Sequence, residues 1–160
     1  MRHHTVIDSP YGPLTLVADD GVLCGLYMTD QRHRPPEETF GTPDDAWSRE
    51  AEEQLKAYFG GELKEFTLEV RLHGTPFQRT VWEQLCRIPH GETRTYGELA
   101  DALGNPKASR AVGLANGRNP IGIIVPCHRV VGADGSLTGY GGGLERKQRL
   151  LDFERGAALF

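Results

Sequence analysis

The stretch TYGELADALGNPKASRAVGLANG, residues 95–117, decides the fold of the second half of the chain. It opens with a capping box at Thr95–Glu98, in which each side chain is expected to bond the other residue's backbone N–H. Gly104 ends the first helix, and Asn105-Pro106 predicts the start of a second helix over about 107–116. Two short helices separated by a glycine turn are typical of a helix-turn-helix motif.

Helical signals continue upstream of this motif. Thr75-Pro-Phe-Gln is another capping box, with proline at the first helical position. Apolar residues then recur at 4-4-3 spacing from Phe77 to Ile88, which predicts one buried helix face. Downstream, the predicted elements are short buried strands at 121–125 and 130–131, a glycine-rich loop at 134–143 and an amphipathic helix at 144–155.

The first half of the chain reads as a small sheet followed by one helix. Short apolar runs predict strands, and Asp19-Asp-Gly between two of them is typical of a hairpin turn. Residues 31–45 are polar and proline-rich, which predicts a loop. A helix is expected from about Ala46 to Gly60-Gly61. The predicted strands are Thr5–Asp8, Leu14–Ala18, Val22–Met28 and Phe66–Leu72.

The composition is that of a globular chain of 160 residues, 38% hydrophobic and 25% charged. No apolar stretch approaches the ~18 residues that cross a bilayer, and the first residues lack the apolar core of a secretory signal. Three cysteines are an odd number and lie far apart, which argues against a disulfide framework and for a reducing compartment. We therefore expect a cytoplasmic protein with no membrane partner.

Charge is divided unevenly along the chain. Residues 1–76 carry seven Lys/Arg and 14 Asp/Glu, a net charge of −7, whereas residues 77–160 carry 11 and eight, a net charge of +3. The formal net charge of −4 therefore hides a mildly basic second half. A basic half of this kind is compatible with nucleic-acid binding, although most small basic patches are simply solvated.

The side chains best suited to carry out a reaction lie in the segment Ile124-Val-Pro-Cys-His-Arg-Val130. A free thiol is only about 3% ionised at neutral pH, and burial lowers that fraction further. A histidine that takes the thiol proton reverses this, through a bridging water where adjacent side chains diverge. A carboxylate then has to orient the imidazole, and Glu154 on the last helix is the best-placed candidate. The simpler interpretation of a cysteine in an apolar run is packing, and Cys24 and Cys86 keep that interpretation.

These residues resemble a known family. The string Asn119-Pro-Ile-Gly-Ile-Ile-Val-Pro-Cys-His-Arg-Val130 is similar to the active-site signature of the O6-alkylguanine-DNA alkyltransferases, or methylated-DNA–protein-cysteine methyltransferases. Four other segments follow the family pattern in order, so that the resemblance is strong over about residues 75–155. They are Phe77-Gln-Arg-Thr-Val-Trp82, Ile88-Pro-His-Gly-Glu-Thr-Arg-Thr-Tyr-Gly97, Asn105-Pro-Lys-Ala-Ser-Arg-Ala-Val-Gly113 and Tyr140-Gly-Gly-Gly-Leu144.

The resemblance implies an α+β fold in two parts. Residues 1–74 would form a ribonuclease-H-like lobe, a small antiparallel sheet with one helix. Residues 75–160 would form a helical, winged-helix-like lobe that contains the helix-turn-helix and carries both DNA binding and alkyl transfer. Some family members hold a structural zinc in the first lobe through two cysteines and two histidines. Cys24 is the only cysteine in this part of the chain, so we expect no metal there.

The implied activity is irreversible repair of O6-alkylguanine, and of O4-alkylthymine, in DNA. Cys127 would be the nucleophile that takes the alkyl group, so that each molecule reacts once and needs no cofactor. His128 would deprotonate Cys127 through a water, and Glu154 would orient His128. Asn119 would support the site, and Tyr96 would donate a hydrogen bond or a proton to the guanine ring. Val130, Tyr140 and Gly141 would bind the base.

The resemblance also implies double-stranded DNA as the partner, with the target nucleotide turned out of the stack. The second helix of the helix-turn-helix would enter the minor groove, and Arg110 would fill the gap left by the flipped base. We expect a monomer that can bind DNA cooperatively. The other residues expected at the DNA surface are Thr95, Gly97, Asn105, Ala108, Ser109 and Arg118.

Two other functions remain open at the level of sequence. A helix-turn-helix protein that recognises alkylated bases without reacting would leave Cys127 without a chemical role. A cysteine hydrolase built on Cys127 and His128 would need an oxyanion hole and would turn over many times. The number of alkyl groups accepted per molecule separates all three functions.

Overall fold

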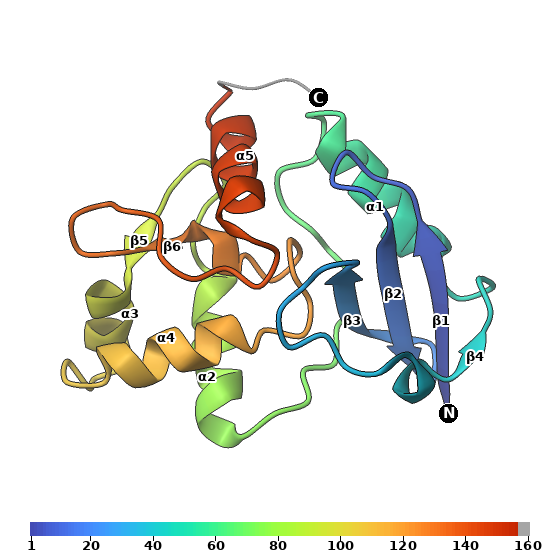
Figure 1. Ribbon diagram of the computed structural model, residues 1–160, viewed down its shortest axis with the longest axis horizontal. Helices are drawn as coiled ribbons and strands as arrows, with labels where there is room; N and C mark the ends of the chain where they lie inside the picture. The colour runs from blue at the N-terminus through green and yellow to red at the C-terminus, as the bar shows by residue number, and fades with distance from the viewer. Residues whose placement is uncertain (157–160) are drawn as a thin grey trace.

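Three short strands near the start of the chain pair into a small sheet, as the sequence predicts, although the first strand begins at Arg2 instead of the predicted Thr5 (Figure 1). In the computed structural model, which describes residues 1–156, β1 (Arg2–Ile7) pairs antiparallel with β2 (Leu14–Asp19), and β2 with β3 (Val22–Met28). Asp20 and Gly21 both have positive φ, as a two-residue hairpin turn requires. A short parallel strand, β4 (Thr42–Pro43), completes the order β3-β2-β1-β4.

One helix covers this sheet. The helix α1 (Arg49–Phe59) buries Ala51, Leu55 and Tyr58 and ends at Gly60. It begins three residues after the predicted start at Ala46, because the backbone N–H groups before it bond to the acidic turn at Asp44-Asp45 instead. A 3-10 turn, η1 (Glu37–Phe40), carries Phe40 against Tyr27 in a small second cluster of apolar side chains.

The predicted strand Phe66–Leu72 is wrong except at one residue. Only Val70 forms a bridge, to Leu23 of β3, and the N–H of Arg71 donates to the carbonyl oxygen of Leu23 at 2.8 Å. The alternate apolar residues of the segment pack on the core as it passes from α1 to the next helix. The alternation of apolar residues over 66–72 therefore reflects burial of every second side chain, and not pairing in a sheet.

The second half of the chain is helical, and both predicted capping boxes are confirmed. Thr75 caps α2 (Pro76–Leu85) and Thr95 caps α3 (Tyr96–Ala102). The next helix, α4 (Ser109–Gly117), begins later than the predicted 107, because Asn105-Pro106 forms a turn in which the Ala108 N–H donates to the Asn105 carbonyl. The last helix is α5 (Leu144–Glu154).

The predicted strand at 121–125 is wrong except at Ile121, which forms an isolated bridge, and the side chain of Asn119 accounts for the irregular backbone that follows. Its Oδ1 accepts from the Ile121 N–H at 3.0 Å, and its Nδ2 donates to the Val125 carbonyl at 2.7 Å. These backbone groups are thereby withdrawn from strand pairing, and the chain turns through Ile123 with a φ of 70°. The 3-10 turn η2 (Cys127–Arg129) follows, and then β6 (Val130–Val131), which pairs with β5 (Arg94–Thr95).

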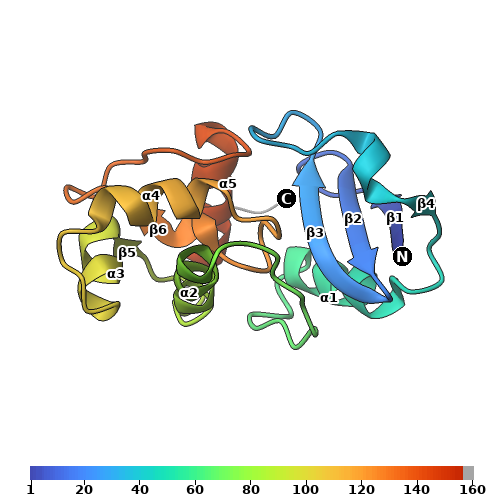
Figure 2. The same ribbon diagram turned by 90° about the horizontal axis from the view of Figure 1, so that it is seen from below.

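The two lobes, β1 to α1 and α2 to α5, meet across the edge of β3 (Figure 2). The N–H of Leu26 donates to the Pro120 carbonyl at 2.9 Å, and Leu26 forms a bridge with Ile121. One apolar cluster runs through both lobes. The chain is thus the α+β fold that the sequence predicts. No helix in residues 1–156 has the length and apolar character to cross a membrane.

Candidate active site

A buried carboxylate lies at the centre of the candidate site. Glu154, the last residue of α5, is 6% exposed and accepts a hydrogen bond from Nε2 of His128 at 2.8 Å. Arg129 donates to both oxygens of the same carboxylate, each at 2.8 Å, and also to the Ile88 carbonyl at 2.7 Å. The hydroxyl of Tyr58 adds another hydrogen bond at 2.6 Å.

The protonation states of Glu154 and His128 follow from burial and from the charged residues beside them. Burial acts to raise the pKa of Glu154, but the neighbouring His128 and Arg129 outweigh it and hold that pKa well below its usual range. Burial lowers the pKa of His128, and the adjacent Glu154 offsets this only in part. At neutral pH the site therefore holds a carboxylate beside an uncharged imidazole.

The same contacts fix which nitrogen of His128 is free to act as a base. Because Glu154 is ionised, it can only accept, so Nε2 of His128 carries the hydrogen. Nδ1 then holds the lone pair, and it has no hydrogen-bond partner among residues 1–156. A neutral imidazole held in this tautomer by a carboxylate is the arrangement of a general base.

Cys127 precedes this histidine and is also buried, with 6% of its surface exposed. Burial raises the pKa of its thiol, while the Asn119 side chain and the Lys147 ammonium act in the opposite direction. The backbone of Cys127 is held as well, because its carbonyl accepts from Nδ2 of Asn116 at 3.3 Å and its N–H donates to the Val125 carbonyl at 2.8 Å. The thiol is therefore fixed in place and depends on a base for its ionisation.

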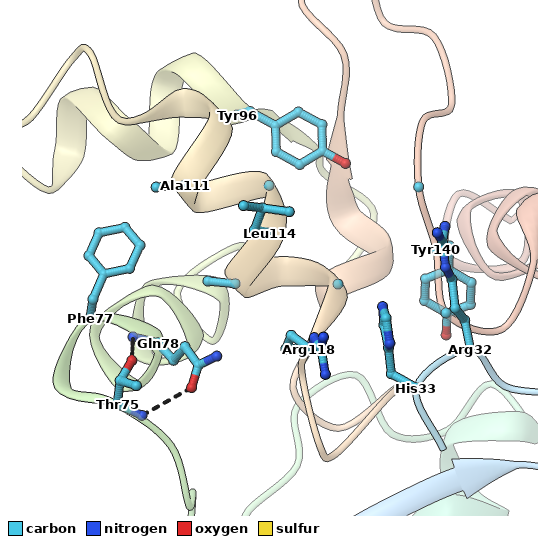
Figure 3. A pocket seen from close by; sticks show the side chains of 15 residues that line it. Arg32, His33, Thr75, Phe77, Gln78, Tyr96, Ala111, Leu114, Arg118 and Tyr140 are labelled. Carbon is cyan, nitrogen blue, oxygen red and sulfur yellow. Dashed lines mark hydrogen bonds between the residues drawn. The ribbon is translucent and has the colours of Figure 1, made fainter. Parts of the chain in front are cut away.

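A cavity of about 670 Å³ lies between the helix-turn-helix and the glycine-rich loop (Figure 3). Tyr96 and Tyr140 line it, and the side chains of Arg118, Arg32 and His33 gather at one side. Gly141 also lines this cavity, whereas Val130 and Cys127 do not.

Tyr140 lies near the thiol of Cys127, close enough that a thiolate there contributes to the rise in the pKa of Tyr140, after burial as the main cause.

The glycine-rich loop over the cavity is attached from three sides. The buried ammonium of Lys147 donates to the carbonyls of Thr138 and Gly139 at 2.9 and 3.4 Å, and burial lowers the pKa of this lysine to about 8. The hydroxyl of Tyr96 donates to the Thr138 carbonyl at 3.0 Å. From the other lobe, the N–H of Arg32 donates to the Gly141 carbonyl at 2.7 Å.

Two family models match the chain. Residues 2–72 match the ribonuclease-like domain of 6-O-methylguanine DNA methyltransferase, and residues 76–156 match its DNA-binding domain. The chain belongs to the 6-O-methylguanine DNA methyltransferase family.

Named relatives of this methyltransferase match it over nearly its whole length. The methylated-DNA–protein-cysteine methyltransferase of Mycobacterium bovis is 57% identical over 99% of this chain and 95% of the relative. That of Methanosarcina acetivorans is 50% identical over 95% and 97%. The crystal structure of Mycobacterium tuberculosis OGT in complex with DNA superposes with a TM-score of 0.91, at 57% identity over 98% of this chain and 95% of the other.

The residues of the methyltransferase that were predicted to bind DNA lie on one part of the C-terminal lobe. Thr95 and Gly97 are at the start of α3, and Ser109 lies near Gly97, so the two helix starts meet. Arg110 is exposed on the first turn of α4, and Arg118 is at its end. Asn105 is exposed in the turn before α4 and Ala108 is its half-buried N-cap.

Four residues around the candidate site of the methyltransferase were not predicted from its sequence: Tyr58, Arg129, Lys147 and Asn116. A signal existed for two of them. Arg129 is a charged residue in an apolar run, and a buried cation requires a partner. Lys147 is four residues before Leu151 and seven before Glu154, the spacing of one helix face. Tyr58 had the pattern of a core residue, and no local signal indicates where its hydroxyl points.

Proposed function

We propose that this chain repairs DNA by transferring the alkyl group of O6-alkylguanine onto Sγ of Cys127, once per molecule. The proposal is supported by the buried thiol of Cys127, which is followed in the chain by an uncharged His128. Nε2 of this histidine bonds to the ionised Glu154, which leaves Nδ1 to act as a base. Membership of the 6-O-methylguanine DNA methyltransferase family supplies the substrate class. The same chemistry extends to O4-alkylthymine, which carries a comparable alkylated oxygen.

The first step is ionisation of the thiol. Nδ1 of His128 takes the proton of Cys127 through one water molecule, and the resulting imidazolium is stabilised by the carboxylate of Glu154. Asn119 and Lys147 stabilise the thiolate, since both lower the pKa of Cys127. Asn119 also fixes the turn before the cysteine, so that the sulfur is held in one position.

In the second step the sulfur attacks the alkyl carbon, the C–O6 bond breaks, and its electron pair stays on the guanine. The leaving base takes a proton or hydrogen bond from the hydroxyl of Tyr96, which lines the cavity and has to release the Thr138 carbonyl in order to donate. Tyr140, Gly141 and the backbone of Val130 hold the base. The thioether product has no easy reverse reaction, so the protein is consumed, and no cofactor takes part.

Double-stranded DNA binds through the minor groove. Helix α4 enters the groove with Ala108 and Ser109 at its start, where small side chains allow close approach. Arg110 occupies the space of the flipped nucleotide, which offsets part of the few kcal/mol that base flipping costs. The remaining contacts, at Thr95, Gly97, Asn105 and Arg118, hold the DNA backbone.

The test follows the label on the alkyl group. The protein is incubated with duplex DNA that contains radiolabelled O6-methylguanine, and label on the protein is counted and mapped to a peptide. We expect up to one equivalent, located on Cys127, and none in Cys127→Ser. Cys86→Ser is the matched control, because Cys86 is an exposed free cysteine of the same lobe and should leave transfer unchanged.

The two other functions give different results in this experiment. Label released as free product beyond one equivalent indicates a cysteine hydrolase and contradicts the proposal. Tight binding to the lesion without any transfer indicates a non-catalytic recognition protein. That function has less support, because relatives over the full length are named as methyltransferases and Cys127 is present.

Several properties complete the proposal. The chain divides into residues 1–74, the lobe that supports the fold, and residues 75–160, the lobe that binds DNA and reacts; residues 157–160 lie outside the described structure. It acts in the cytoplasm as a monomer and can bind cooperatively along DNA. Sedimentation of the free protein and of its complexes with duplexes of increasing length measures both.

A further inference from the structure

The carboxylate of the reactive centre receives a hydrogen bond from the opposite lobe. The hydroxyl of Tyr58, on α1, donates to Oε2 of Glu154 at 2.6 Å, across 96 positions of the chain. This is the same oxygen that accepts from Nε2 of His128. Tyr58 has no exposed surface, and Glu154 is 6% exposed.

The aromatic ring of Tyr58 is fixed by its neighbours, so the direction of its hydroxyl is fixed too. Phe59, Phe66 and Phe153 surround it with centroid distances of 5.3, 5.3 and 5.6 Å. The ring of His90 lies edge-on at 6.1 Å. A phenylalanine would keep these ring contacts and would remove only the hydroxyl.

We propose that Tyr58 is a positioning residue for alkyl transfer. Through it the N-terminal lobe holds Glu154 in place and sets how strongly this carboxylate binds the protonated form of His128. The inference rests on the proposed function, because it concerns the base that activates Cys127. The hydroxyl of Tyr58 bonds to Glu154, so its effect on His128 and on the thiol passes through that carboxylate.

The physical reason is competition for one oxygen. Oε2 of Glu154 accepts from Tyr58, from His128 and from Nη2 of Arg129, so its negative charge is shared among three donors. Without the Tyr58 hydroxyl the oxygen is more basic and less restrained. It then binds the protonated form of His128 more strongly and holds the imidazole less rigidly.

Several charged or titratable groups surround Glu154 and His128 and influence the pKa of His128. Arg129 and Lys147 act against protonation of His128, and Glu154 favours it. Tyr58→Phe leaves all of these in place and changes only one donor to Glu154. The other neighbours are His90 and the hydroxyls of Tyr11 and Tyr140.

The experiment measures single-turnover transfer from free O6-benzylguanine, which removes DNA binding from the rate, over about pH 5 to 9, where histidine titrates. In Tyr58→Phe we expect the maximal rate to fall about ten-fold, which corresponds to about 1.4 kcal/mol. The acidic limb of the pH–rate profile should move to higher pH, because His128 becomes protonated more easily.

Tyr27→Phe is the matched control, since it removes the hydroxyl of a buried tyrosine of the same lobe in the separate cluster with Phe40. Its rate and pH profile should be those of the unchanged protein. A second measurement follows the ring signals of His128 by NMR in Cys127→Ser with and without Tyr58→Phe. It should report a higher pKa for His128 in the double variant.

An unchanged rate and acidic limb in Tyr58→Phe overturn the inference. A slower rate with an unmoved limb and an unmoved His128 titration also overturn it, since these indicate a structural role only. If the unchanged protein takes no benzyl group, the same rates and pH profiles are measured with duplex DNA that contains radiolabelled O6-methylguanine; if it takes no methyl group either, the proposed function fails instead. The two failures are therefore distinct.

Discussion

At the scale of single residues, the reactive centre is a set of paired charges and hydrogen bonds in a buried place. The contact between His128 and Glu154 was predicted from the sequence, because Glu154 shares a helix face with apolar residues, and the contact is confirmed. Tyr58 and Arg129 were not predicted, since their roles depend on contacts across 96 and 25 positions of the chain. Local patterns report burial well and report hydrogen-bond direction poorly.

A prediction at this scale concerns Glu154→Gln. The amide cannot balance Arg129 or hold the His128 imidazolium, so we expect alkyl transfer to fall about a hundred-fold. The free energy of unfolding at neutral pH should drop by about 3–5 kcal/mol, because a buried guanidinium loses its partner. Glu145→Gln, at an exposed position of the same helix, should change neither quantity.

The same carboxylate predicts a dependence of stability on acid. The pKa of Glu154 is lower in the folded protein than in the unfolded chain. The contribution of Glu154 to the free energy of unfolding is therefore complete above its pKa in the unfolded chain, about 4.3. It is lost as the pH falls from there towards the pKa in the folded protein. Denaturant unfolding between about pH 6 and pH 3 should show a steeper loss in the unchanged protein than in Glu154→Gln. Equal slopes would contradict this assignment.

At the scale of elements, the helix starts were predictable and the irregular segments were not. Capping boxes at Thr75 and Thr95 are local and therefore visible in the sequence. The turn at Ile121–Val125 resembles a strand in its apolar composition, but the Asn119 side chain takes its backbone hydrogen bonds. The position of the Cys127 thiol depends on this turn, so a segment that the sequence predicts poorly lies next to the proposed nucleophile.

Loss of a cap gives a prediction at the scale of α2. Thr75→Ala removes the side-chain oxygen that accepts from the Gln78 N–H at 3.1 Å, and should lower the free energy of unfolding by about 1 kcal/mol. Thr80→Ala, inside the same helix, should change stability by less than about 0.5 kcal/mol. Thermal or denaturant unfolding compares the two variants. An equal effect of both would show that the cap contributes nothing.

At the scale of the whole molecule, the chain places an acidic lobe beside a basic one. Residues 1–76 carry −7 and residues 77–160 carry +3, so duplex DNA is attracted to the lobe that carries α3 and α4. The fold class and DNA binding by the second lobe were predictable from composition and from five ordered motifs. The contact between lobes at β3 was not, because backbone hydrogen bonds between distant segments leave no pattern in the sequence.

Arg110→Ala tests how the molecule uses DNA. Arg110 is exposed on α4 and, by the proposed function, fills the gap in the duplex. We expect transfer from duplex DNA to slow about ten-fold or more, the equivalent of at least about 1.4 kcal/mol, while the rate with free O6-benzylguanine stays within about two-fold. Arg49→Ala removes the same charge from α1 and should affect neither substrate. Equal losses on both substrates would contradict the role of Arg110.

The attachment of the glycine-rich loop to the first lobe has a consequence for chimaeric proteins. The Arg32 N–H bonds the carbonyl of Gly141, and the segment from Gly141 to Glu154 is thus tied at each end to residues encoded early in the chain. The first of these bonds joins two backbone atoms and the second requires only a tyrosine at position 58, so neither depends on most of the side chains of the two lobes. We therefore expect chimaeras that join the first lobe of one relative to the second lobe of another to keep both ties wherever that tyrosine is present.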